Sequence, residues 1–252
     1  MDLTAISILY MDPAIILQTI TQMWATAGFA CNPSPWMLVD NRWPLSTEPE
    51  WIAAVSNFKS ALACANPILE RPERNRGGHG GFNFGLEKLK ALTSFTAETL
   101  VLNYDLDIWP LTPGWGKAMV DVMRADPSLG YVALLDERCV NNRRWRFETI
   151  AGHRCAVTDS TDMWAATLFR GRALDKGMLA PTLYYGKVEI AMEAHMREIG
   201  MRWCYLYDFR ETKHPVPHHP IYSQYKREHA DGRYFGSFEE YVRDKMPLSG
   251  AV

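Results

Sequence analysis

Two aspartates, one residue apart, stand where an apolar run ends. Residues 101–104 lead into Asp105 and Asp107 in the stretch VLNYDLDIWPLTPGWG, which then becomes a turn rich in proline and glycine. Carboxylates at a strand end supply the hard oxygen ligands that Mg²⁺ and Mn²⁺ prefer and usually share with phosphate oxygens. Aspartate also caps turns by accepting backbone hydrogen bonds. The spacing by itself therefore leaves two interpretations, a cation site and a turn.

The elements that must position these aspartates alternate in the first half of the chain. Apolar runs predict strands at residues 3–10, 36–39 and 99–105, and helical spacing predicts helices at 16–27, 50–63 and 86–92. The stretch ERPERNRGGHGGFNFG before the last helix is typical of a glycine-rich loop. Strands separated by helices predict a single α/β domain with a mostly parallel central sheet and helices on both faces. Functional residues then gather at the carboxyl ends of the strands, where Asp40, Asp105 and Asp107 lie.

The second half is less regular. It predicts helices at 114–124 and 187–199 and strands at 131–137, 147–152, 165–170 and 201–207. The stretch HPVPHHPIYSQYKREH is predicted to be irregular because it is rich in proline, and Ser237 with Glu240 forms a capping box that starts a last helix. We expect a domain over residues 1–220, with a nucleotide-binding half at 1–110 and an acceptor half at 111–220, followed by a C-terminal tail at 221–252.

Composition narrows the function classes. With 47% hydrophobic residues in 252, the chain can bury a large core. A net charge of -2 disfavours a protein that holds nucleic acid mainly through phosphates, although a local basic patch is compatible with it. Five scattered cysteines without a C-x-x-C pair argue against a disulfide framework and a zinc knuckle. Asp2, with Asp12 and Pro13 interrupting the first apolar stretch, predicts neither a signal peptide nor a membrane span, so we expect a cytoplasmic protein.

An ordered set of motifs resembles the nucleotide-sugar glycosyltransferases of the GT-A fold, most closely the family 2 type. The motifs are ISILYMDPAIILQTI, WMLVDN, GGFNFGLEKL, NYDLDIWPLTPGW, ATLFRGRAL and YYGKVEIAMEAHMREIG. Glu189 stands eleven residues before Gly200, and His214 stands fourteen residues after it, as in that family. The resemblance covers roughly residues 3 to 220.

The resemblance implies a metal-dependent glycosyltransferase that moves a sugar from a nucleoside-diphosphate sugar to a hydroxyl acceptor with inversion. It implies that Asp105, Asp107 and His214 hold Mn²⁺ or Mg²⁺, and that Glu189 is the catalytic base. The chain has KVE where the family usually has Glu-Asp, which leaves the base and the stereochemical outcome open. A surface loop for His214 and a plain helix charge for Glu189 are the alternatives.

Donor binding is assigned on the same basis to Tyr10, Asp40, Arg76, Asn83 and Asp105. For Tyr10 and Asp40 the alternative is ordinary strand-end structure, and for the glycine-rich stretch it is a loop without a ligand. Arginines in NNRRWRF, with Arg154 and the tail stretch YSQYKREH, are compatible with a polymeric acceptor that carries hydroxyls, either a saccharide or hydroxymethylated bases in viral DNA. A solvated basic face is the alternative for the arginine run.

Two other functions fit parts of the pattern. A sugar nucleotidyltransferase also pairs carboxylates around Mg²⁺, but it needs a basic, glycine-rich loop after the first strand, where this chain has YMDPAI. A non-catalytic nucleotide- or carbohydrate-binding module would keep the aromatic pocket without requiring a metal. The sequence does not indicate the sugar or the base of the donor.

Overall fold

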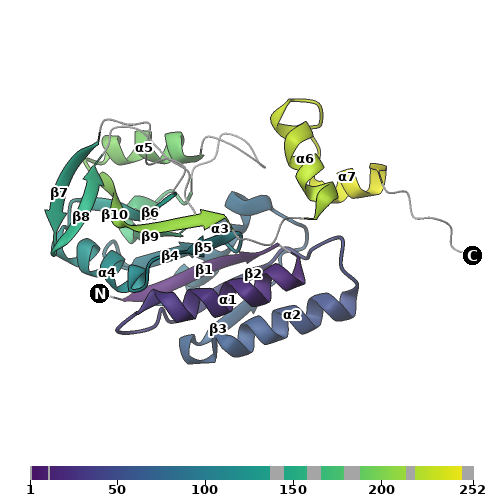
Figure 1. The fold of residues 1–252 in the computed structure, drawn as a ribbon, viewed down its shortest axis with the longest axis horizontal. Coiled ribbons are helices and arrows are strands. Elements are labelled where there is room, and N and C mark those ends of the chain that lie inside the picture. Colours follow the sequence, from purple (N-terminus) through teal and green to yellow (C-terminus); the bar gives the residue numbers. More distant parts are fainter. Residues whose placement is uncertain are drawn as a thin grey trace, which may run out of the picture.

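The computed structural model of the protein describes residues 2–10, 12–136, 145–157, 166–178, 188–213 and 219–245 (Figure 1). The strands are β1 (Leu3–Leu9), β2 (Trp36–Asp40), β3 (Pro67–Glu70), β4 (Leu100–Tyr104), β5 (Ile108–Pro110), β6 (Leu129–Asp136), β7 (Arg146–Ile150), β8 (His153–Val157), β9 (Ala166–Arg170) and β10 (Arg202–Lys213). The helices are α1 (Pro13–Ala27), α2 (Glu48–Ala61), α3 (Gly77–Leu92), α4 (Trp115–Ala125), α5 (Val188–Glu198), α6 (Pro220–Ala230) and α7 (Phe238–Lys245), with short 3₁₀ turns η1 (Ala63–Ala65) and η3 (Gly171–Leu174). In these residues we find no helix with both the length and the apolar character that crossing a membrane requires.

One mixed sheet organises the molecule. Its order is β3-β2-β1-β4-β9-β6-β10-β8-β7, and β5 pairs with β10. The first four strands in this order are parallel, as predicted. Beyond them β9 runs antiparallel to both β4 and β6, and the β7–β8 hairpin joins β10 antiparallel. The carboxyl ends of β1, β2 and β4 therefore meet at one edge.

Helices cover both faces of this sheet, and each face has its own core. Side chains from α1, α2 and α4 pack on one face, including Ile16, Trp51 and Met119. Side chains from α3 and α5 pack on the other, including Leu86 and Met192. In Figure 1, α1 and α2 lie together along the lower side of the sheet, whereas α5 lies above it.

The first strand and helix follow directly from local sequence. Residues of β1 are almost all buried, as expected for a strand covered on both faces. Asp12 caps α1 by accepting from the Ala14 N–H at 2.9 Å, and Pro13 occupies the first helical turn, where its missing N–H costs nothing. Gly28 ends the helix in the left-handed conformation, with φ 62°.

Two segments predicted to be irregular are helical. The glycine-rich stretch forms the first turns of α3, because its glycines let the helix approach the sheet: a Cβ at Gly85 would lie 2.9 Å from Val39 Cγ2. Part of the proline-rich tail is α6, which begins at Pro220 after the cap His219. Proline favours the first position of a helix, so it marks a start here and not a break. The Ser237 and Glu240 capping box of α7 is confirmed, with reciprocal bonds of 2.7 and 3.2 Å.

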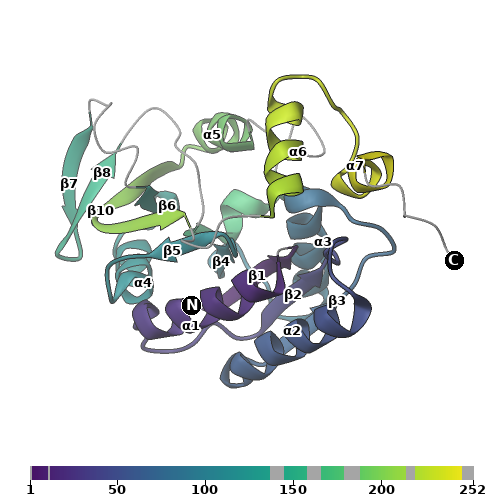
Figure 2. The same cartoon turned by 45° about the vertical axis from the view of Figure 1, so that its right-hand side comes forward.

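The C-terminal helices α6 and α7 lie side by side at one end of the molecule (Figure 2). Their aromatic residues Tyr222 and Phe238 join the core cluster of the α1 and α2 face. Trp43, which follows β2 and is 2% exposed, contacts both: its ring centroid lies 5.0 Å from that of Tyr222 and 5.3 Å from that of Phe238. Residues 219–245 therefore pack against the nucleotide-binding half predicted from the sequence.

Candidate functional site

The D-x-D turn directs its two carboxylates away from the core. Leu106 between them is 2% exposed and packs inward, whereas Asp105 and Asp107 are half-buried. The buried Thr19 hydroxyl donates to the Leu106 carbonyl at 2.6 Å, which ties the turn to α1. Asn103 Nδ2 donates to Asp105 Oδ1 at 3.3 Å. The turn is therefore fixed through its middle residue, and both carboxylates face the same side.

Both carboxylates line a pocket of about 250 Å³ at the carboxyl ends of β1 and β4. One side of this pocket, which we call the strand wall, is formed by the strand ends and includes Tyr10, Asn103, Asp105 and Asp107. The facing side, the helix wall, comes from α6 and α7 and consists of Tyr222, Tyr225, Lys226, Phe238 and Glu239. The start of α3 contributes Gly77, Gly78 and His79. Residues from three distant parts of the sequence thus enclose one cavity.

A lysine of the helix wall faces the D-x-D turn. Lys226 Nζ lies 3.7 Å from Asp107 Oδ2, and the two side chains are only 28% and 23% exposed. The ammonium also lies 4.8 Å from the ring centroid of Tyr222. Because the pair is largely withdrawn from water, its charges are less screened than those of a surface ion pair. The pocket lining therefore combines three carboxylates, those of Asp105, Asp107 and Glu239, with the ammonium group of Lys226.

A second polar contact joins the two walls on Glu239. Its Oε1 accepts a hydrogen bond from the Tyr10 hydroxyl at 3.1 Å and another from Asn75 Nδ2. Tyr10 also makes an edge contact with Trp43, with ring centroids 5.3 Å apart. A carboxylate that accepts two bonds holds α7 against β1 and against the loop before α3.

The amino terminus of α3 opens into the pocket. The first N–H groups of a helix have no partners within the helix and carry partial positive charge. Asn75 Oδ1 accepts from the Gly77 N–H at 2.7 Å and so caps this end. Burial lowers the pKa of His79 below its ordinary value of 6.5, which favours the neutral imidazole in the folded protein. This side of the pocket suits an anionic group such as a phosphate.

Three of the residues predicted to bind the donor lie outside the pocket lining. The Asp40 side chain is fully buried and accepts bonds from Arg71, from Trp51 Nε1 at 2.9 Å and from the Arg42 N–H at 2.9 Å. It therefore serves to hold β2, α2 and the following loop together. Its role in binding the donor base stays a prediction that this geometry does not favour.

The polar groups of Asn83 and Arg76 also have other partners. Asn83 exchanges hydrogen bonds with the backbone of Met178, at 2.9 Å through Nδ2 and 2.6 Å through Oδ1. The exposed Arg76 guanidinium lies 5.0 Å from the ring centroid of Phe84. Tyr10 and Asp105, by contrast, both line the pocket. Of the five predicted donor-binding residues, the structure brings these two together.

Of the predicted base and the predicted third metal ligand, only the base lies among the described residues. Glu189 occupies the first turn of α5, next to Val188, which lines the pocket. His214, the proposed third metal ligand, lies outside the described residues. Within the part of the chain that the structure describes, no group of three or more His, Cys, Asp or Glu side chains is arranged to hold a metal ion.

The oxygen ligands that Asp105 and Asp107 offer nevertheless fit a hard divalent cation. Asp105 and Asp107 offer carboxylate oxygens on one turn, facing the pocket. Magnesium and manganese commonly take only one or two protein carboxylates and complete their coordination with water and phosphate oxygens. Two carboxylates that line an open pocket meet that requirement.

Sequence reasoning predicted helix α7 from its capping box, but it missed α6 and did not predict that either helix lines the pocket. Lys226 and Glu239 lie in a segment that was expected to be a C-terminal tail. The one available signal was SQYKREH with GSFEEYVRDK, two short amphipathic patterns whose aromatic residues needed a partner surface.

Comparisons with known proteins give a fold but no close relative. Neither a protein-family model nor a curated protein sequence matches the chain. Among solved structures, the mannosyltransferase PcManGT from Pyrobaculum calidifontis, in complex with GDP-Man and Mn²⁺, has a TM-score of 0.62 at 17% identity, over 96% of this chain and 68% of that one. GalNAc-T7 with UDP, GalNAc and Mn²⁺ has a TM-score of 0.58 at 9% identity, over 96% of this chain and 54% of that one.

A third match is S. aureus TarS 1-349 in complex with UDP, with a TM-score of 0.51 at 15% identity, over 84% of this chain and 60% of that one. The chain spans about two thirds of the first structure and a little over half of the second. At identities this low, the matches show the fold. The protein has the GT-A fold of these glycosyltransferases, which confirms the fold predicted from the motifs.

Proposed function

We propose that the protein is a metal-dependent glycosyltransferase that uses a nucleoside-diphosphate sugar. The observation that carries this proposal is the convergence of Asp105, Asp107 and Lys226 on one pocket, at the strand edge where a GT-A fold places its donor site. Structures of the same fold contain GDP-Man or UDP, two of them with Mn²⁺. That likeness supports the donor class and the metal without identifying the sugar.

The chemistry assigned to the pocket is stabilisation of a diphosphate leaving group. Breaking the bond between the sugar and the phosphate leaves negative charge on the diphosphate, and fixed positive charge beside it lowers the barrier. Asp105 and Asp107 would hold Mn²⁺ or Mg²⁺, which supplies Lewis-acid neutralisation of that charge. Lys226 adds a second cation from the facing wall, and the amino terminus of α3 adds backbone N–H groups.

The acceptor hydroxyl must lose a proton as it attacks the anomeric carbon. We assign this general-base role to Glu189 and infer an inverting transfer, because the residue lies in the first turn of α5 beside Val188 of the pocket lining. The acceptor is a hydroxyl of a saccharide or of a hydroxymethylated base in DNA. His214 remains the proposed third ligand for the metal.

Titration of the purified protein with GDP, UDP and their sugar derivatives, by calorimetry with Mn²⁺ or with EDTA, tests the proposal. We expect one nucleoside diphosphate to bind in a manganese-dependent way. We expect Asp107→Asn to lower transfer or donor hydrolysis by about 10²-fold or more, the scale of losing one electrostatic stabiliser of a transition state. Asp121→Asn changes a half-buried helix aspartate that pairs with Lys117 and is absent from the pocket lining, so it is the matched control and should leave binding unchanged.

The outcomes separate the alternative functions. No binding of any nucleotide would contradict the proposal and return the D-x-D turn to a structural role. Tight binding that ignores Mn²⁺ and gives neither hydrolysis nor transfer would identify a binding module. Release of pyrophosphate from a nucleoside triphosphate with a sugar phosphate would identify a nucleotidyltransferase.

A further inference from the structure

Arginine side chains have different partners on the two faces of the sheet formed by β7, β8 and β10. Side chains alternate along a strand, so Arg146 and Glu148 share one face of β7 while Phe147 lies on the other. By the same alternation Arg202 on β10 lies on the face of Glu148, and Tyr207 lies on that of Phe147. This part of the sheet therefore presents two distinct surfaces.

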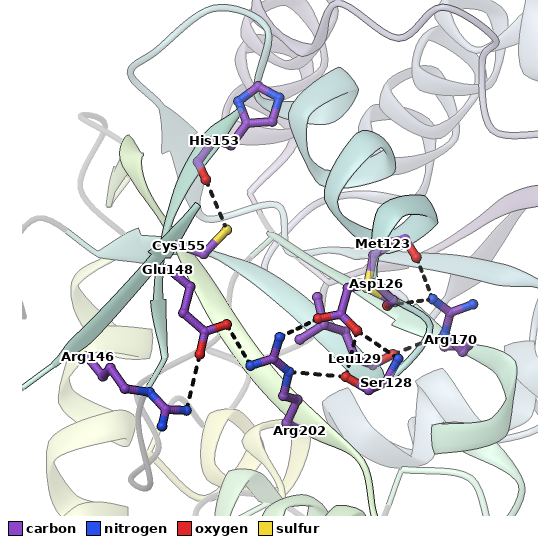
Figure 3. Close-up of polar contacts among 10 residues, drawn as sticks. All are labelled: Met123, Asp126, Ser128, Leu129, Arg146, Glu148, His153, Cys155, Arg170 and Arg202. Atoms are coloured by element: carbon purple, nitrogen blue, oxygen red, sulfur yellow. Dashed lines mark hydrogen bonds and ion pairs between the residues drawn. The ribbon is translucent and has the colours of Figure 1, made fainter. Parts of the chain in front are cut away.

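On the first face the arginines are neutralised. Arg202 pairs with Asp126 and, at 2.7 Å, with Glu148, and Glu148 in turn lies 3.2 Å from Arg146 (Figure 3). The two carboxylates thus balance the charges of the two guanidinium groups. The same neighbourhood also fixes Arg170, whose Nε donates to the Leu129 carbonyl at 3.0 Å. This face is a structural network without spare positive charge.

On the second face the arginines contact aromatic rings. The Arg154 guanidinium lies 4.0 Å from the ring centroid of Phe147 and 4.3 Å from that of Tyr207. Arg210 lies 4.3 Å from the Tyr207 ring, and its buried Nη1 has no acceptor within the described part of the chain. Among the described residues, neither guanidinium forms an ion pair with a carboxylate. We call Phe147, Arg154, Tyr207 and Arg210 the arginine–aromatic stack.

Two members of this stack are open to solvent, and the strand that carries the other two, which are half-buried, continues toward the pocket. Arg154 is exposed, and Phe147 is 41% exposed although it is a large apolar side chain. From Arg210 the strand β10 runs on to pair with β5, which directly follows the D-x-D turn. A bound chain could therefore extend from the stack toward the site of sugar transfer.

We propose that the arginine–aromatic stack binds the acceptor, and that this acceptor is a single strand of nucleic acid. The identification of the ligand as the acceptor rests on the proposed function, whereas its binding does not. Planar guanidinium groups held on ring faces are preorganised to donate two hydrogen bonds to one phosphate. Exposed ring and guanidinium planes also stack on bases, which are splayed out only in single strands.

The chemistry favours this ligand over two others. A neutral saccharide stacks on aromatic faces but has no charge to pair with two guanidinium groups. An acidic peptide has the charge but no flat groups to extend the stack. A nucleotide strand supplies both in each repeating unit, which matches a surface that combines two guanidinium groups with the adjacent rings of Phe147 and Tyr207.

Fluorescence anisotropy with a labelled single-stranded oligodeoxynucleotide, without any donor or metal, tests the inference. Arg154→Gln and Arg146→Gln provide a matched pair, because each removes one positive charge from the same hairpin but on opposite faces. We expect Arg154→Gln to weaken binding about tenfold and to reduce the dependence on salt by about 0.7 in the logarithmic slope. Arg146→Gln should change affinity less than about twofold. Arg154→Lys, which keeps the charge without the planar group, should fall between them.

Each other result would overturn the inference. Equal losses in Arg154→Gln and Arg146→Gln would show that binding follows net charge and not the stack. Failure of the wild-type protein to bind the oligonucleotide, with its donor binding intact, would remove nucleic acid as the ligand. Tighter binding of a uronate polysaccharide than of the oligonucleotide would assign the stack to an acidic saccharide. Thermal midpoints of the variants confirm that folding is retained in each case.

Discussion

The two walls of the pocket are built in different ways. The strand wall is part of the sheet: Asn103 lies within the paired strand β4, and the D-x-D turn is tied to α1 through the Leu106 carbonyl. In the part of the chain that the structure describes, the helix wall is attached by side chains, through the rings around Trp43, the carboxylate of Glu239 and the ion pair of Lys226 with Asp107. Backbone pairing fixes the anionic groups, while side-chain packing brings the cation Lys226 to them. Changes in the second wall should thus alter donor binding without altering the sheet.

The largest expected effect comes from removing the Trp43 side chain, which packs between the two walls. Trp43→Ala deletes a side chain that is 2% exposed and contacts Tyr10, Tyr222 and Phe238. We expect the free energy of unfolding to fall by about 3–5 kcal/mol, as for other buried aromatic residues. Denaturant unfolding measures this loss.

The control for this change is Phe235→Ala, which removes a side chain of the same C-terminal segment that is 78% exposed. Its effect should stay within about 0.5 kcal/mol. Similar losses in both variants would show that the helix wall is not anchored at Trp43.

The next effect concerns the cation of the helix wall. Lys226→Gln should weaken nucleoside-diphosphate binding about tenfold, or about 1.4 kcal/mol, because one half-buried positive charge is lost beside the proposed phosphate site. The loss should be greater in EDTA. There the divalent metal ion is removed, and Lys226 is the one of the two proposed cations that remains in the wild-type protein. Lys226→Arg should restore most of the affinity.

Lys245 supplies the matched control. It is half-exposed on α7, lies 3.9 Å from Glu228 and is absent from the pocket lining. Calorimetry should find unchanged affinity in Lys245→Gln. If both glutamine variants bind alike, Lys226 contributes only to packing.

A smaller effect is expected where the walls touch through Glu239. Glu239→Gln keeps an oxygen that can accept from Tyr10 and Asn75 but removes the charge that strengthens both bonds. We expect donor affinity to fall about threefold, with little change in turnover at saturating donor, because the contact positions α7 and touches no reacting atom. Steady-state kinetics separates KM from kcat; a loss confined to kcat would contradict this role.

The smallest effect is a pH dependence of stability from His79. Burial lowers the pKa of His79 below 6.5, so the unfolded chain binds a proton there more readily than the folded protein does. Its stabilising contribution is present above the ordinary pKa and is lost as the pH falls below it. Unfolding free energies measured from about pH 8 down to about pH 5 should decline less in His79→Gln than in the wild type. A steeper decline in the variant would contradict a lowered pKa of His79 in the folded protein.

Sequence patterns located most elements of the first half because those elements are stabilised locally. The strands β1, β2 and β4 are apolar runs, and α1 carries its own cap at Asp12. Prediction was wrong for the first turns of α3 and for α6, where glycine and proline were interpreted as loop signals. Gly81 and Gly85 let α3 pack closely on the sheet, and Pro220 fits the first turn of α6.

For the site, the sequence indicated the D-x-D turn and Tyr10, since both follow strands whose ends must meet at one edge. It did not reveal that Asp40 and Asn83 have their polar atoms committed to Arg71 and Met178. An aspartate is the same residue in the sequence whether its carboxylate faces a ligand or is buried and bonded to a neighbouring arginine, as in Asp40. Only burial and the direction of the side chain separate the two.

The sequence by itself determined the GT-A order of strands and helices and the carboxylate pair at the end of β4, because strand periodicity and D-x-D spacing are local properties. The tertiary structure alone decided that α6 and α7 close the pocket and place Lys226 opposite Asp107. These residues lie more than a hundred positions apart in the chain, so no local propensity encodes their contact. Packing of aromatic side chains around Trp43 decides it.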